Sequence, residues 1–119
     1  MKFRHVTLAV KDIEASAKFY QEIVGLAVIR QFSAGPGREI IFLGSGDTQL
    51  ELISGADHGG AEPGSGVSMG FAADSLDEMI ATLRDQGYET DGQIVSPQPG
   101  VTFFFAKDPD GYTVQFITE

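Results

Sequence analysis

The sequence KDPDGYTVQFI, residues 107–117, predicts a tight turn followed by the closing strand of a sheet. Pro109 presets the backbone φ angle that such a turn needs, and Gly111 adopts a positive φ without steric cost. The residues after the turn alternate in character, as they do along a strand with one buried face. This alternation places Gln115 on the side opposite Val114 and Phe116.

An earlier stretch, GSGDTQLELI at residues 44–53, has the same form. A turn rich in Gly and Asp leads into a short strand, in which Leu50 and Leu52 face one way and Glu51 faces the other. Glu51 and Gln115 therefore occupy the same place in two copies of one pattern. The function depends on what these two side chains surround.

The two copies extend over the whole chain, with a repeat of about sixty residues. Each copy reads as strand, helix, strand, strand, strand, and the helices are expected to cover the apolar face of each sheet. We therefore predict an α+β fold: one domain, 1–119, of two βαβββ modules, 1–54 and 67–119, whose curved mixed sheets enclose one cavity. The Gly-rich segment 55–66 is the predicted linker. The expected helices are 12–24 and 75–87, and the expected strands are 3–10, 26–32, 39–43, 49–53, 67–73, 90–95, 101–106 and 112–117.

Composition excludes several classes of function. The chain has 119 residues, no cysteine and a formal net charge of −9, so thiolate metal sites and a cysteine nucleophile are excluded. The negative charge argues against nucleic acid and anionic membranes as partners. No apolar run approaches the roughly 20 residues that span a bilayer. The opening residues show no signal-peptide pattern, which predicts a cytoplasmic location.

Aligning the two copies defines a set of four candidate site residues. The first strands align His5 with Ser68, an offset of 63 (68 − 5), and the closing strands align Glu51 with Gln115, an offset of 64 (115 − 51). All four residues are expected on the faces away from the helices, so they would line the shared cavity. Imidazole and carboxylate suit a divalent metal ion, whereas an amide oxygen or a hydroxyl is a weaker ligand. Phe104 is expected to line an apolar part of the same cavity.

The motifs HVTLAV, DIEASAKFY, QLELI and KDPDGYTVQF, in this order, resemble those of the vicinal oxygen chelate superfamily. This superfamily includes glyoxalase I, extradiol dioxygenases, methylmalonyl-CoA epimerase, and fosfomycin- and bleomycin-resistance proteins. The resemblance covers nearly the whole chain. It implies paired βαβββ modules that hold one divalent metal ion on their first and last strands.

The resemblance also implies roles for single residues. His5 matches the usual first-strand histidine ligand, and Glu51 matches the closing-strand glutamate of the first module. Ser68 stands where a histidine is usual. Gln115 stands where a glutamate is usual, and in glyoxalase I that glutamate is the favoured base. The expected metal ligands are thus His5, Glu51 and Gln115, with weak or no binding of nickel or zinc, and Glu51 is the one retained candidate base.

Three hypotheses about function follow from these residues. The first is a metal-dependent lyase or isomerase that resembles lactoylglutathione lyase. The second is a binding protein that sequesters a small, partly aromatic molecule without turnover, as a resistance protein does. The third is a scaffold or regulatory dimer with a closed cavity. A homodimer is expected in each case, because an open apolar strand edge is costly.

Overall fold

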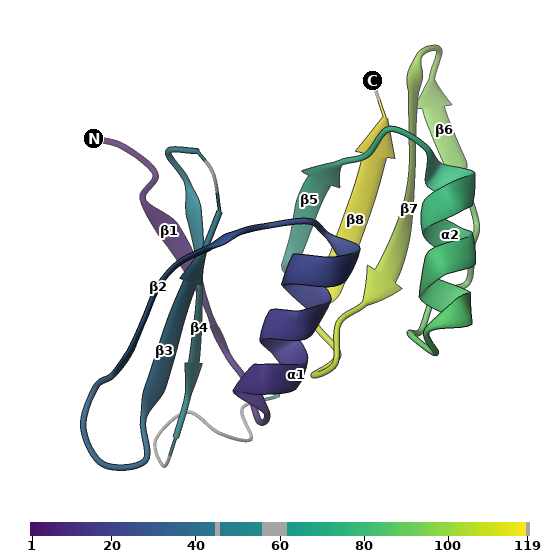
Figure 1. Cartoon of the computed structure of the whole chain (residues 1–119). Helices are drawn as coiled ribbons and strands as arrows, with labels where there is room; N and C mark the ends of the chain where they lie inside the picture. Colours follow the sequence, from purple (N-terminus) through teal and green to yellow (C-terminus); the bar gives the residue numbers. More distant parts are fainter. Residues whose placement is uncertain (45, 56–61, 119) are drawn as a thin grey trace. The chain divides into compact units, whose positions relative to one another are not determined.

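The computed structural model describes residues 1–44, 46–55 and 62–118, which form two compact units, Met1–Glu62 and Pro63–Glu119. Each unit is a mixed four-stranded sheet with helical segments, so the expected α+β class is confirmed (Figure 1). The strand orders are β1-β4-β3-β2 and β5-β8-β7-β6, with one parallel pair in each, β1 with β4 and β5 with β8. The remaining neighbours are antiparallel.

The first unit contains β1 (His5–Ala9), β2 (Val28–Ser33), β3 (Glu39–Leu43) and β4 (Gln49–Ser54). Leucines at alternate positions of β1 and β4 are buried, and the helix α1 (Ile13–Lys18) packs against β4 and β3. The buried leucines are Leu8, Leu50 and Leu52. Burying each such side chain contributes about 1.5–3 kcal/mol of transfer free energy. This core fixes which residues of β1 and β4 point away from the helix.

The first helix begins as expected but does not continue as a regular α-helix. The Asp12 carboxylate caps it by accepting the backbone N–H groups of Glu14 and Ala15, each at 3.1 Å. After Lys18 the chain forms a π-helical turn, η1 (Phe19–Ile23), in which Val24 donates its N–H to the carbonyl of Phe19. The expected helix 12–24 is therefore corrected to an α-helix that continues as a π-helical turn. The three large apolar side chains of this turn are all buried: Phe19, Tyr20 and Ile23.

The second unit contains β5 (Ser68–Ala72), α2 (Leu76–Asp85), β6 (Val95–Gln98), β7 (Val101–Lys107) and β8 (Thr113–Thr118). Ser75 caps α2 by accepting the N–H of Glu78 at 3.2 Å, and α2 packs against β8. Helix α2 buries Leu76, Ile80 and Leu83, and the sheet buries Phe104, Val114 and Phe116.

One strand of the second unit lies later in the chain than its pattern suggested. The expected strand 90–95 is wrong, because Thr90 forms only an isolated bridge to Ala106 and the strand β6 starts at Val95. The chain bends between these points at Gly92, which has a φ of +65°. Residues 96–98, expected in a loop, belong to β6, and Pro97 is tolerated there because β6 is an edge strand.

The turn at the end of the chain forms as predicted. Gly111 has a φ of +96°, and its N–H donates to the carbonyl of Asp108 at 3.0 Å. The Asp108 carboxylate accepts the N–H groups of Asp110 and Tyr112, each at 2.9 Å. These bonds hold the chain as it reverses from β7 into β8, and so set the register that places Gln115 beside Phe105.

Candidate functional site

Three polar side chains of the first unit meet on the sheet face that points away from α1. The parallel register of β1 and β4 pairs Thr7 with Glu51. The Thr7 hydroxyl donates a hydrogen bond to Glu51 Oε1, and His5 Nε2 lies 3.5 Å from the same oxygen. The His5 side chain is 41% exposed and that of Glu51 is 15% exposed. The imidazole is therefore open to solvent, while the carboxylate is largely covered and held by Thr7.

An aromatic cluster lies beside this polar group on the same face. Phe42 is the cross-strand partner of Glu51 on β3, and Arg30 is the partner of Phe42 on β2. The His5 ring meets Phe42 edge-on at 5.6 Å between centroids, and Phe32 stacks on Phe42 at 6.4 Å. We call this surface the His5 face; its residues are His5, Thr7, Arg30, Phe32, Phe42 and Glu51, and it continues into the buried cluster of Ile40, Phe42 and Ile53.

The second unit reproduces the register of the first with different chemistry. Gln115 pairs with Gly70, two residues after Ser68, as Glu51 pairs with Thr7, two residues after His5. No hydroxyl corresponds to that of Thr7, since Gly70 has no side chain. The Gln115 amide occupies that space, because a Cβ atom added to Gly70 would lie 3.2 Å from Gln115 Oε1. In the second unit, the uncharged amide of Gln115 next to Gly70 thus takes the place of the Glu51 carboxylate next to Thr7.

The strand β7 corrects the facing expected for one aromatic residue. Phe104 is fully buried and stacks on Phe116 at 5.4 Å, on the face opposite Gln115. Phe105 is the cross-strand partner of Gln115, and Phe103 meets Phe105 edge-on at 5.5 Å. A run of three phenylalanines shows that the residues alternate between the two faces, but not which of them faces the helix. Phe104 was expected on the face of Gln115, and this expectation is wrong.

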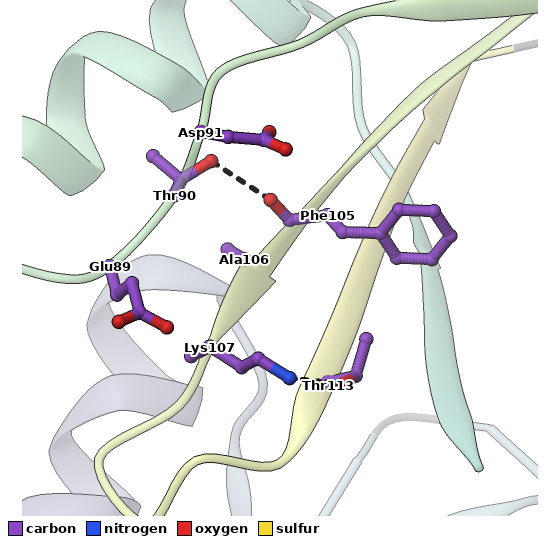
Figure 2. A pocket seen from close by; sticks show the side chains of 7 residues that line it. All are labelled: Glu89, Thr90, Asp91, Phe105, Ala106, Lys107 and Thr113. Atoms are coloured by element: carbon purple, nitrogen blue, oxygen red, sulfur yellow. Dashed lines mark hydrogen bonds between the residues drawn. The ribbon is translucent and has the colours of Figure 1, made fainter. Parts of the chain in front are cut away.

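A pocket of about 380 Å³ lies in the second unit, where the segment after α2 runs beside β7 (Figure 2). That segment contributes Glu89, Thr90 and Asp91, and the strands contribute Phe105, Ala106, Lys107 and Thr113. Lys107 Nζ donates to the Thr113 hydroxyl at 2.8 Å, and the Thr90 hydroxyl donates to the carbonyl of Phe105 at 2.9 Å. In the sequence this pocket is indicated only by Gly92, whose positive φ turns the chain away from β7.

The donor set does not fit a complete nickel or zinc site. His5 and Glu51 are good ligands and lie close together, but Ser68 and Gln115 offer only a hydroxyl and an amide. Within residues 1–44, 46–55 and 62–118, no three His, Asp or Glu side chains are placed to hold a metal ion. His58, the second histidine of the sequence, lies outside the described residues.

The described helices are also too short or too polar to cross a membrane.

Comparisons with known proteins agree with the fold. The model of the glyoxalase/bleomycin resistance protein/dioxygenase superfamily matches residues 2–116. Lactoylglutathione lyase of Haemophilus influenzae is 30% identical over 125 residues, which cover 98% of this chain and 92% of the relative. Lactoylglutathione lyase of Neisseria meningitidis is 30% identical over 124 residues, 98% of this chain and 90% of the relative.

Solved structures show the same architecture. A trypanothione-dependent glyoxalase I of Leishmania major has a TM-score of 0.83 and 25% identity, and the match covers 100% of this chain and 87% of that one. An antibiotic binding protein from Streptomyces sp. CB03234 has a TM-score of 0.71 and 23% identity, over 98% of this chain and 93% of that one, and shares the fold alone. With the family model matching almost every residue, this chain belongs to the glyoxalase/bleomycin resistance protein/dioxygenase superfamily.

Proposed function

We propose that this protein binds a small organic molecule on its His5 face and does not turn it over by metal-dependent chemistry. One observation carries the proposal: Ser68 and Gln115 occupy the register positions that correspond to His5 and Glu51. Neither residue supplies the imidazole or the carboxylate that a paired metal site would need. The fold is retained, and half of the donor set is replaced by neutral groups.

The chemistry of the Gln115 side chain supports binding over catalysis. An amide cannot accept a proton as a carboxylate does, but it offers both a hydrogen-bond donor and an acceptor. Loss of a general base costs about 10²–10⁴ in rate. The same substitution leaves hydrogen bonding to a neutral ligand intact, as a binding protein requires.

A second candidate function is a metal-dependent lyase resembling lactoylglutathione lyase. The observation in its favour is the approach of His5 Nε2 to Glu51 Oε1 at 3.5 Å, together with relatives of that name at 30% identity. In this candidate His5, Glu51 and Gln115 would hold nickel or zinc, which would polarise substrate oxygens. Glu51 would then be the base, since it is the carboxylate present at the paired positions.

Two measurements separate the candidates. Protein purified without chelator or affinity tag is dialysed and analysed for nickel and zinc, and lyase activity is assayed with methylglyoxal and glutathione in the presence of each added metal. We expect no retained metal and turnover at the background rate. Robust turnover that disappears in Glu51→Gln, while Thr48→Val remains active, would refute the binding proposal.

The double variant Ser68→His with Gln115→Glu tests the reasoning about the donor set. It restores an imidazole and a carboxylate at the two neutral positions, so we expect nickel or zinc binding at least tenfold tighter than that of the original protein, measured by calorimetry. The matched control is Ser96→His with Gln98→Glu, which introduces the same residues on the edge strand β6. Equal metal binding by the two double variants would show that positions 68 and 115 have no special role.

We further propose that the protein is a homodimer. The strand β2 is the outermost strand of its sheet and exposes two large apolar residues outside the His5 face, Val28 and Ile29. Such an edge invites pairing with a second chain. Sedimentation velocity at micromolar concentration is expected to give a dimer, and a monomer alone would contradict this proposal while leaving the fold untouched.

A further inference from the structure

The His5 face contains a guanidinium group whose position suggests a specific task. Arg30 Cζ lies 4.2 Å from the centroid of the Phe42 ring and 5.9 Å from that of Phe32. Stacking of this kind uses the flat face of the guanidinium and contributes about 0.5–1 kcal/mol at an exposed site. The N–H donors lie in the plane of the group, so contact through its flat face leaves them able to bind a ligand. The ion pairs found among the described residues do not include Arg30.

The strand register arranges the groups of this face in a line. Glu51 on β4, Phe42 on β3 and Arg30 on β2 are successive cross-strand neighbours. Neighbouring strands lie about 4.8 Å apart, so Arg30 and Glu51 are separated by roughly 10 Å with the Phe42 ring between them. The charged or titratable groups on this face are Arg30 at one end, and His5 and Glu51 at the other. The face therefore has a cation at one end and an imidazole beside a carboxylate at the other. Phe42, in the middle, is only 5% exposed, so the aromatic ring that this face offers to a ligand is that of Phe32.

We propose that Arg30 is the specificity-determining residue for a planar aromatic anion that binds along this line. The carboxylate, sulfonate or phenolate of the ligand pairs with the outward edge of the guanidinium, in the two-point geometry that arginine favours. Its ring lies against Phe32, a residue that is 42% exposed and available for contact. A hydroxyl at the far end of the ligand donates to the Glu51 carboxylate, beside His5. This inference rests on the proposed binding function and adds the class of ligand.

A purely structural role for Arg30 makes a different prediction. The aliphatic part of an arginine can cover an apolar surface without binding anything. Replacing Arg30 with methionine would keep that coverage and remove only the charge and the N–H donors. The two roles therefore differ in what Arg30→Met does to charged and uncharged ligands of the same shape.

The test uses two fluorescent probes that share an N-phenylnaphthylamine body. One, 1-anilinonaphthalene-8-sulfonate, carries a sulfonate, and the other, N-phenyl-1-naphthylamine, is neutral. Both are titrated into the original protein and into Arg30→Met, Arg30→Lys and Arg4→Met. Arg4 is an exposed arginine adjacent to His5 in the sequence and lies outside the strands that carry Phe32 and Phe42. Its replacement removes the same charge and leaves the stacking of Arg30 intact. Circular dichroism confirms that each variant is folded.

We expect Arg30→Met to weaken binding of the sulfonate probe about tenfold or more and to change binding of the neutral probe by less than twofold. A charge-assisted hydrogen bond contributes an amount of this order. Arg30→Lys should weaken binding of the sulfonate probe about threefold, because lysine keeps the positive charge and loses the paired N–H donors of the planar guanidinium. Arg4→Met should change the binding of neither probe.

Every other outcome decides against the proposal in a distinct way. Equal weakening of both probes by Arg30→Met would make Arg30 a packing residue. Equal weakening of the sulfonate probe by Arg4→Met and Arg30→Met would indicate a nonspecific charge effect. Binding of the neutral probe alone would overturn the anionic ligand class and leave the binding function standing. Binding of neither probe would count against both.

Discussion

Replacement of Asp108 by alanine should destabilise the protein through the turn that begins the closing strand. The Asp108 side chain is 5% exposed, and its Oδ1 atom accepts two backbone N–H groups, those of Asp110 and Tyr112, at 2.9 Å each. A hydrogen bond to a charged group contributes about 1.5–3 kcal/mol. Since both bonds share one oxygen and the turn is only partly buried, the lower end applies to each, and the loss is about 3 kcal/mol.

Urea denaturation followed by far-ultraviolet circular dichroism measures this change. A loss of about 3 kcal/mol is a large part of the roughly 5–15 kcal/mol that stabilises a typical domain. It should lower the melting temperature of a chain of this length by about 10 °C. The m-value should stay the same, because the surface exposed on unfolding does not change.

Two further variants isolate the cause. Asp108→Asn keeps an acceptor oxygen and loses only the charge, so we expect a cost of about 1 kcal/mol. Asp47→Ala removes a carboxylate from the corresponding turn of the first unit, where the side chain is 85% exposed, and should change stability by less than about 0.5 kcal/mol. If Asp108→Ala were no more damaging than Asp108→Asn, the side chain would not hold the turn and the reasoning would be refuted.

Two other substitutions test local geometry in the first unit by the same urea assay. Gly55→Ala should lower the free energy of unfolding by about 2–4 kcal/mol, because Gly55 has a φ of +133° and a Cβ atom there would overlap the carbonyl oxygen of Gly37. Gly35→Ala should lose only the energy of backbone strain, since Gly35 has a φ of +106° and no atom near the added Cβ. Equal losses in the two variants would argue against the contact between residue 55 and Gly37. Thr7→Val should lower the free energy of unfolding by about 1 kcal/mol, because it removes the hydroxyl that donates to Glu51. Thr7→Ser keeps that donor and should be less destabilising. If Thr7→Ser were the more destabilising variant, packing of the Thr7 methyl group would matter more than the hydrogen bond.

Strand alternation made much of the fold predictable from the sequence. Thr7, next to buried Leu8, and Glu51, between buried Leu50 and Leu52, identify the face that points away from α1. Asp12 and Ser75 mark the helix starts because their side chains accept backbone N–H groups of the first helical turn. Where the local signal is ambiguous, the prediction failed, as in the phase of the phenylalanine run that contains Phe104.

The candidate site could be predicted only in part, for a physical reason. His5 and Glu51 are recognisable because an imidazole and a carboxylate on an apolar strand need partners. The stacking of Arg30 on Phe42 depends on the pairing of β2 with β3, and that pairing contains a register shift between Val28 and Arg30. A bulge of this kind reverses which residues share a face, and the sequence contains no glycine or proline there to mark it.

The π-helical turn at Phe19–Ile23 has a consequence for how the two halves of the chain compare in length. Gly25 follows the capping residue Asp12 by 13 positions (25 − 12), whereas Gly87 follows Ser75 by 12 (87 − 75). Each glycine ends its helix with a positive φ, +87° and +80°. A π-helical turn accommodates one more residue than a regular turn, so η1 absorbs the extra position without moving either helix end. A difference in length between the halves can thus be accommodated inside a helix. A variant that lacks one residue of η1 would test whether the first helix can then wind as a regular α-helix, as α2 does.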